Sequence, residues 1–320
     1  MSSKALSFDS AAFDAFAADY DATFTDSTLG RLLRPRVWEV LAQHFQPGDH
    51  ILELACGTGE DAVWLAQRGL HVTATDGSVQ MVAQTQAKAQ AAGVKEQVNA
   101  VQMSLQQLVR GQGGGGRGQG SGVTKQGAGS RGVFDFAQGT PSSPPALQPS
   151  NPPPLQSSTP PFLHPSLPFS GLFSNFGGLN TINDWRGLAR SLAHLIKPGG
   201  KVILVPMGPL CPWEIGWHLL HGQVSTAFRR LGESAPAKIG EAVIPIWYPS
   251  ALRLKADFER WFNHLETQSL GLWLPPSYLG HFVERWPTLF KRLNQWERAT
   301  ATLTGGWGDH YLIVFERKSL

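Results

Sequence analysis

Residues 51–61, Ile-Leu-Glu-Leu-Ala-Cys-Gly-Thr-Gly-Glu-Asp, constrain the fold more than any other part of the chain. A short apolar run stops at a Gly-x-Gly turn, and a helical pattern follows from Asp61 to Arg68. A strand, a glycine turn and a helix in this order begin a nucleotide-binding α/β unit. Carboxylates surround the turn, because Glu53 ends the strand and Glu60 and Asp61 begin the helix.

The charge at this turn helps to choose between two kinds of nucleotide ligand. A dinucleotide would place its pyrophosphate at the helix N-terminus, where Glu60 and Asp61 would repel it. A ligand with an adenosine, no phosphate and a positive centre fits better, and S-adenosylmethionine (SAM) is such a ligand. Spacing alone does not exclude NAD, because residues 57–62 also satisfy G-x-G-x-x-A and Asp76 follows at about the 20-residue distance of a ribose-binding acid. A turn with no ligand is the third alternative, but Asp76 ends a second apolar strand in the right order.

Two further segments extend the pattern, namely residues 71–78, His-Val-Thr-Ala-Thr-Asp-Gly-Ser, and residues 197–205, Lys-Pro-Gly-Gly-Lys-Val-Ile-Leu-Val. With residues 53–59, they resemble the class I SAM-dependent methyltransferases of the small-molecule type (methyltransferase type 11/25-like). Residues 53–59 resemble that family's first motif, E-x-G-x-G-x-G, with Ala55 at the usual place of the first glycine. Residues 71–78 resemble the second motif, whose acid binds both ribose hydroxyls.

The resemblance implies an α/β fold with a seven-stranded Rossmann-like methyltransferase sheet, mostly parallel with one antiparallel edge strand and helices on both faces. Alternating apolar runs and helical patterns predict the same parallel arrangement. The predicted strands are 51–55, 70–75, 98–103, a fourth strand discussed below, 201–205, 268–274 and 311–316. The predicted helices lie within 8–46 and at 60–68, 78–92, 184–196 and 281–298.

Ligands bind at the carboxyl ends of the strands in such a sheet. Asp76 is expected to accept two hydrogen bonds from the ribose, and Glu53 is expected to orient the glycine loop or meet the ligand's amino group through water. The resemblance places an aromatic residue such as Tyr20 over the methionine half of the cofactor, although packing on the core is an equal alternative. The expected cofactor-binding residues are Tyr20, Glu53, Ala55, Cys56, Gly57, Thr58, Gly59, Asp76, Gly77, Ser78, Met103, Ser104, Ser174 and Asn175.

A low-complexity insertion interrupts the alternation at residues 111–167, first rich in Gly and then rich in Pro and Ser. Such a composition buries too little apolar surface to offset the entropy of ordering, so we expect disorder within an otherwise single methyltransferase domain, 1–320. The fourth strand can start at Phe134 or at Phe169. We favour Phe169, because Phe134 would place a proline-rich loop inside a central strand.

Residues 206–265 are rich in aromatic and histidine side chains and are expected to form a cap over the methyl acceptor. Glu214, His218 and His221 share one face of a predicted helix and are the candidate catalytic residues. Methyl transfer from a sulfonium needs alignment more than a particular base, so each of them could merely line the pocket. A metal site is not expected, because no further ligand is evident beside the His-x-x-His pair.

Composition limits the remaining possibilities. A net charge of +3 with scattered basic residues gives no electrostatic case for nucleic acid. Two cysteines imply no disulfide framework, no apolar run approaches the ~18 residues of a membrane span, and we expect a cytoplasmic protein. The predicted function is methyl transfer from SAM to a small-molecule acceptor. An NAD-linked oxidoreductase and a non-catalytic SAM-binding or interaction protein are the alternatives, while the acceptor, the methylated atom and the oligomeric state stay open.

Overall fold

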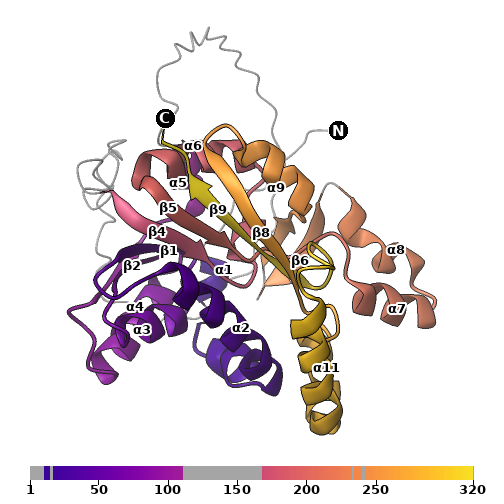
Figure 1. Cartoon of the computed structure of the whole chain (residues 1–320). Helices are drawn as coiled ribbons and strands as arrows, with labels where there is room; N and C mark the ends of the chain where they lie inside the picture. The colour runs from indigo at the N-terminus through magenta and orange to yellow at the C-terminus, as the bar shows by residue number, and fades with distance from the viewer. Residues whose placement is uncertain (1–10, 15–16, 111–167, 233, 240–241, 320) are drawn as a thin grey trace, which may run out of the picture.

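The computed structural model describes residues 11–14, 17–110, 168–232, 234–239 and 242–319. Its centre is a seven-stranded sheet with the strand order β3-β2-β1-β4-β5-β9-β8 (Figure 1). This arrangement confirms the predicted seven-stranded, mostly parallel sheet. The strands are β1 (His50–Leu54), β2 (His71–Asp76), β3 (Val98–Gln102), β4 (Phe169–Ser174), β5 (Ile196–Leu204), β8 (Phe262–Leu270) and β9 (His310–Arg317).

Strand β9 is the one strand of this sheet that runs against the others. It pairs antiparallel with β5 on one side and with β8 on the other, so the reversed strand lies next to the sheet edge. Its amino end therefore lies at the same edge of the sheet as the carboxyl ends of β4 and β5. That placement brings residues 309–310 to the edge where ligands bind in sheets of this kind.

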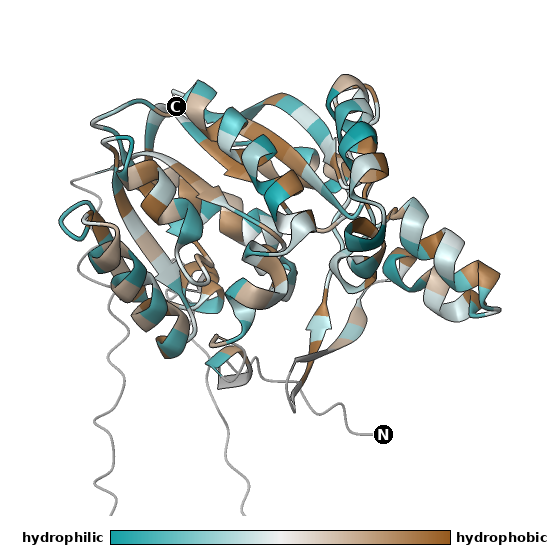
Figure 2. Ribbon diagram, turned by 90° about the horizontal axis from the view of Figure 1, so that it is seen from below, coloured by the Kyte–Doolittle hydropathy of each residue, from teal (hydrophilic) through white to brown (hydrophobic). Residues whose placement is uncertain are grey.

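Helices cover both faces of the sheet, and alternating strand residues face two separate apolar cores. In β1, Ile51 faces the first core, whereas Leu52 and Leu54 face the second. Figure 2 shows the strands as mainly hydrophobic and the outward sides of the surrounding helices as hydrophilic. The first core is covered by α2 (Thr28–His44), α3 (Glu60–Ala66), α4 (Val79–Ala91), α10 (His281–Arg285) and α11 (Pro287–Thr300), and the second by α5 (Leu105–Arg110), α6 (Trp185–Leu195) and α9 (Ala251–Phe258).

Two long predicted helices are broken in the structure. The range 8–46 contains α1 (Ala11–Asp14), the π-helix η1 (Asp21–Thr25) and α2, whose N-cap Ser27 accepts a hydrogen bond from the Gly30 N–H at 3.0 Å. The range 281–298 divides into α10 and α11 at Pro287, which has no N–H with which to continue a helix. Helical periodicity alone does not reveal such breaks, because the apolar face continues across them.

The fourth strand begins at Phe169, as favoured from the sequence. Strand β4 pairs in parallel with β1 and β5, so it occupies the centre of the sheet. The alternative start at Phe134 and the insertion 111–167 lie outside the described residues. The insertion connects α5, which was not predicted, to β4.

The segment 206–265 contains α7 (Pro212–Leu220), α8 (Val224–Ala227), η4 (Arg229–Leu231), the hairpin of β6 (Ala235–Ile239) and β7 (Ala242–Ile246), and α9. Helices α7 and α8 lie beside the sheet rather than on it (Figure 1). Helix α9 packs on the second core, and β8 begins at Phe262. The portion available to cover a ligand is therefore shorter than the predicted segment. Within the described residues, no helix combines the length and the apolar character that crossing a bilayer would need.

Candidate functional site

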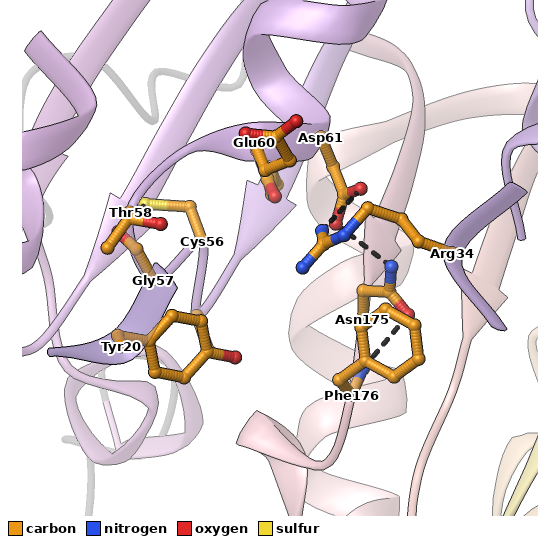
Figure 3. Close-up of a pocket in the computed structure, with 11 residues that line it drawn as sticks. Tyr20, Arg34, Cys56, Gly57, Thr58, Glu60, Asp61, Asn175 and Phe176 are labelled. Carbon is orange, nitrogen blue, oxygen red and sulfur yellow. Dashed lines mark hydrogen bonds and ion pairs between the residues drawn. The ribbon is translucent and has the colours of Figure 1, made fainter. Parts of the chain in front are cut away.

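A pocket opens where β1 and β4 end, at the carboxyl edge of the sheet (Figure 3). Its enclosed volume is about 20 Å³, which is close to the space of one water molecule. The residues that line it are Tyr20, Arg34, Glu53, Ala55, Cys56, Gly57, Thr58, Glu60, Asp61, Asn175 and Phe176. The strand-to-helix turn, the N-terminal helices and the end of β4 thus meet at one place.

The turn after β1 depends on left-handed backbone conformations. Gly57 and Gly59 have φ values of 55° and 77°, and Ala55 has a φ of 54°, which an L-residue adopts only with strain. A side chain at Gly178 would collide with the Ala55 methyl group, so a glycine on the neighbouring segment accommodates this alanine. The alanine that departs from the usual glycine motif is therefore tolerated at a conformational cost.

Asp76 ends β2 and binds the backbone of the glycine loop through its carboxylate. One carboxylate oxygen accepts the Gly57 N–H at 3.0 Å, and the other accepts the Ser78 N–H at 2.9 Å. Burial raises the pKa of Asp76, and the backbone hydrogen bonds oppose that rise. Each oxygen retains a lone pair, so the carboxylate can accept further hydrogen bonds from a diol.

Glu53 is a buried carboxylate on the pocket wall. Its side chain is 1% exposed, and its Oε2 has no hydrogen-bond partner among the described residues. Burial, followed by the negative charge of Asp61, raises the pKa of Glu53 well above its ordinary range. A cationic ligand group beside Oε2 would supply the missing partner and favour the ionised carboxylate.

Both carboxylate oxygens of Asp61 are bound by other residues of the protein. Oδ1 pairs with Nη1 of Arg34 at 2.7 Å and accepts a hydrogen bond from Nε1 of Trp38 at 2.7 Å, and Oδ2 accepts one from Nδ2 of Asn175 at 2.9 Å. Figure 3 shows Arg34 and Asn175 reaching Asp61 from two sides. The other acid of the helix start, Glu60, pairs with Nζ of Lys88 at 2.9 Å. The acidic rim expected from the sequence is therefore compensated, and these two carboxylates do not repel a phosphate as supposed.

The N-terminal segment covers the glycine loop. The ring of Tyr20 lies beside Gly57, and burial raises the pKa of the Tyr20 hydroxyl to about 12. Asp21 accepts a hydrogen bond from the Thr58 hydroxyl at 2.6 Å and forms an ion pair with Lys88 at 2.8 Å. These contacts fasten the π-helix η1 to the loop, so access to the pocket depends on this segment.

Several predicted cofactor residues lie outside the pocket lining. Ser174 donates to the Leu54 carbonyl at 2.8 Å and so joins β4 to β1. Ser78 and Ser104 accept hydrogen bonds at the starts of α4 and α5. Met103 is buried in the second core. The remaining predictions that do not line the pocket are Asp76, at the end of β2, and Gly59 and Gly77 of the two turns.

The three predicted catalytic residues differ in their surroundings. Glu214 is 1% exposed and accepts Nε of Arg229 at 2.8 Å and Nη2 of Arg230 at 2.7 Å. Although burial opposes ionisation, the two guanidinium groups lower the pKa of Glu214, so it is a poor proton acceptor. His218 bonds Gln223, and His221 bonds the Trp217 carbonyl, both through Nδ1 at 2.7 Å. Within the part of the chain that the structure describes, no group of three or more His, Cys, Asp or Glu side chains is placed to hold a metal ion.

Comparison with known proteins supports the assignment of the fold. Residues 51–113 match the family model described as a methyltransferase domain. A SAM-dependent methyltransferase from Methanosarcina mazei superposes with a TM-score of 0.50 at 14% identity, covering 88% of this chain and 97% of that chain. The chain has the class I methyltransferase fold.

Other solved structures are similar at lower scores. DhpI in its complex with SAH gives a TM-score of 0.49 at 14% identity, covering 97% of this chain and 96% of that chain. A geranyl diphosphate C-methyltransferase from Streptomyces coelicolor gives 0.46 at 12% identity, covering 87% and 77%. A search of curated proteins found no match to the sequence.

Two pocket residues of this methyltransferase fold were missed from the sequence. Arg34 lies on the buried face of α2 and is 6% exposed. Its place among the apolar residues of that face was the sequence feature that could have indicated a buried role. Phe176 follows β4 with a φ of 44° and packs against Phe24 and the Arg34 guanidinium. Nothing local distinguished Phe176 from a core aromatic residue.

Replacing Ala55 with Gly should stabilise the protein by roughly 0.5–1 kcal/mol, because glycine adopts a positive φ without strain. Chemical denaturation would measure the free energy of unfolding. Ala83, exposed in the middle of α4, provides the matched control, since Ala83→Gly should destabilise by about 1 kcal/mol. A loss of stability in Ala55→Gly would contradict the strained conformation.

The raised pKa of Glu53 predicts a dependence of stability on pH. Between the ordinary pKa of a glutamate and the raised pKa of Glu53, the folded state retains a proton that the unfolded state has already lost. The free energy of unfolding therefore falls as pH rises through this range. Glu53→Gln should therefore become more stable than the wild type as pH rises from 5 to 8, by roughly 1–3 kcal/mol. Thermal unfolding across this pH range would test it, with the exposed Glu39→Gln as a control that shows no such trend.

Proposed function

We propose that the chain is a SAM-dependent methyltransferase that transfers a methyl group to a small-molecule acceptor by direct displacement. The observation that carries the proposal is the pair of carboxylates at the glycine loop. Asp76 keeps free lone pairs toward the loop, and Glu53 has an orphaned buried oxygen. A nucleoside with a ribose diol and an ammonium group satisfies both acids, and SAM carries these two groups.

The proposed binding roles follow from these positions. Asp76 accepts hydrogen bonds from the ribose, and Glu53 meets the ammonium group of the methionine portion. Arg34, whose Nε has no hydrogen-bond partner among the described residues, lies on the same pocket wall and can approach the carboxylate of that portion. The backbone of residues 57–59 lies close to the ligand because two of these residues are glycines.

Binding requires a movement of the N-terminal segment. A cavity of about 20 Å³ does not admit a nucleoside, and Tyr20 lies against the glycine loop. The segment is attached by polar contacts, which join Asp14 to Ser78 and Asp21 to Thr58 and Lys88, and by the packing of Phe24 on Phe176. The polar contacts are partly exposed to water, so opening exchanges them for hydrogen bonds to solvent, and the larger cost is the loss of the ring contact.

Bound SAM supplies an electrophilic methyl group on a sulfonium. The chain's own residues then align the acceptor with this group and exclude water. Phe176 lines the pocket beside Asn175, so its ring is suited to separate the cofactor from the acceptor. The acceptor would enter from the side covered by α7, η4 and residues 247–249, where aromatic side chains are frequent.

Incubation of the protein with SAM radiolabelled in the methyl group and a small-molecule extract tests catalysis. We expect a labelled product of low molecular mass, identified by mass spectrometry, together with S-adenosylhomocysteine (SAH). Heat-denatured protein and protein with SAM alone are the controls. Binding of SAH without any labelled product would favour the non-catalytic alternative.

Calorimetry tests the cofactor. SAH should bind in the micromolar range and NADH should not bind, since Arg34 and Lys88, the cations beside the glycine loop, are already paired with Asp61, Asp21 and Glu60. Asp76→Ala should weaken SAH binding by roughly 1.5–3 kcal/mol, the value of hydrogen bonds to a charged group. Asp49→Ala, at the opposite edge of the sheet, should leave the affinity unchanged. Binding of NADH in preference to SAH would support the oxidoreductase alternative instead.

A further inference from the structure

We propose that His310 accepts the proton that the acceptor loses on methylation, and that Asp309 and Arg230 position it. This inference rests on the proposed function and deepens it, because it restricts the acceptor to a nucleophile that carries an O–H or N–H proton. Sequence reasoning chose other residues for this role, since His310 lies at the end of the chain remote from the glycine motif.

The topology places His310 at the active edge of the sheet. Strand β9 is reversed, so its first residue lies where β4 and β5 end, and His310 forms an isolated antiparallel bridge with Met207. The imidazole packs against Phe176, with ring centroids 5.7 Å apart and planes at 87°. Phe176 lines the cofactor pocket, so His310 lies one ring away from it, on the side of the cap.

A buried polar network surrounds His310. Asp309 Oδ2 lies 3.1 Å from Nδ1 of His310, a distance for charge pairing although not aligned as a hydrogen bond. Asp309 Oδ1 receives Nη2 of Arg230 at 2.7 Å, and the same nitrogen lies 2.7 Å from Glu214. Arg230 also donates to the Asp309 carbonyl at 3.2 Å, so it fixes both the backbone and the side chain of Asp309.

The network leaves one nitrogen of His310 for chemistry. Burial opposes ionisation of Asp309, but Arg230 and then His310 hold the pKa of Asp309 well below its usual range. A permanently ionised carboxylate beside Nδ1 favours the tautomer that carries its proton there. Among the described residues Nε2 has no hydrogen bond, so its lone pair is available to an acceptor. His218 is a weaker candidate for the proton acceptor, because it is on the outer part of α7 and its Nδ1 is hydrogen-bonded to Gln223.

The proposed step balances without a further reactant. The acceptor atom forms a bond to the methyl carbon while the bond from carbon to sulfur breaks, and that electron pair stays on sulfur. The acceptor proton passes to Nε2 of His310, which later releases it to solvent. A proton acceptor speeds attack by a hydroxyl, and it takes up the proton that an N–H acceptor loses once the new bond has formed, whereas attack by an atom without a proton gains nothing from it.

The inference can be tested without knowing the acceptor. If Nε2 faces the methyl group, protonated His310 repels the positive sulfonium of SAM but not the neutral sulfide of SAH. The ratio of the two dissociation constants, SAM over SAH, should then fall on the order of tenfold as pH rises from 5.5 to 8. Calorimetry of the purified full-length chain with each ligand measures this ratio.

Other groups near His310 do not produce this effect. The pKa values of Asp309 and Glu214 are lowered by their guanidinium partners, that of Cys211 is raised by burial to about 12, and burial raises those of Tyr248 and Tyr278, so none of them titrates in this interval. Arg229 and Arg230 stay charged throughout. Burial also raises the pKa values of Glu53 and Asp76, so the ratio is measured in Glu53→Gln and Asp76→Asn as well.

His310→Gln should abolish the pH dependence of the ratio while SAH affinity stays within about twofold of the wild type. His264→Gln, an exposed histidine on β8, is the matched control and should keep the wild-type dependence. A ratio that does not change with pH in the wild type, or that changes equally in His310→Gln, overturns the inference. Failure of SAH to bind at any pH would instead overturn the proposed function itself.

An acceptor found by the labelling experiment permits a second measurement. His310→Gln should lower kcat by about 10²–10⁴-fold with little change in KM for SAM. Asp309→Asn should move the rising limb of the kcat profile to lower pH, because it removes the negative charge beside His310, and a merely structural role would not move that limb. Wild-type kcat in His310→Gln would contradict the assignment.

Discussion

The buried carboxylate of Asp61 is the interaction on which the pocket depends. Its two oxygens bind Arg34 and Trp38 from α2 and Asn175 from the end of β4. Two segments that are distant in sequence, α2 and the end of β4, are thereby fixed against the start of α3, directly after the glycine loop. Loss of one partner would leave an uncompensated charge in the interior, at a cost of about 3–5 kcal/mol. The pocket wall is therefore fixed at Asp61 by partners from both α2 and β4.

The sequence predicted the elements between His50 and Ser104 almost to the residue, because each boundary has a local cause. A glycine with positive φ ends the helices at Gly69 and Gly93, and β1 stops at the Gly-x-Gly turn. The acids Glu53 and Asp76 were placed for the same reason, since Glu53 lies next to the last residue of β1 and Asp76 ends β2. Local patterns did not give the partners of Asp61, because hydrogen bonds between α2, α3 and β4 depend on tertiary packing. The prediction that Glu60 and Asp61 form an uncompensated acidic rim was wrong for this reason.

Two strained residues connect the halves of the site. Ala55 directly follows β1 and Phe176 closely follows the neighbouring β4, and both are non-glycine residues with positive φ. Such conformations persist where the surrounding contacts determine them, and they occur preferentially at binding sites. Phe176 contacts Phe24 and Arg34 on the cofactor side and His310 on the other. Its position therefore links the covering segment, the pocket and the reversed strand.

The site still favours a positively charged ligand over a phosphate, although Glu60 and Asp61 are not the residues responsible. Asp61 is neutralised by Arg34, and Glu60 with Asp21 by Lys88. Glu214 and Asp309 are likewise paired with Arg229 and Arg230. Glu53 on the pocket wall and Asp76 beneath the glycine loop form no ion pair with the described residues, and both have pKa values raised by burial. A pyrophosphate would add negative charge beside these two acids, whereas a ligand with an ammonium group and a sulfonium supplies positive charge that they lack.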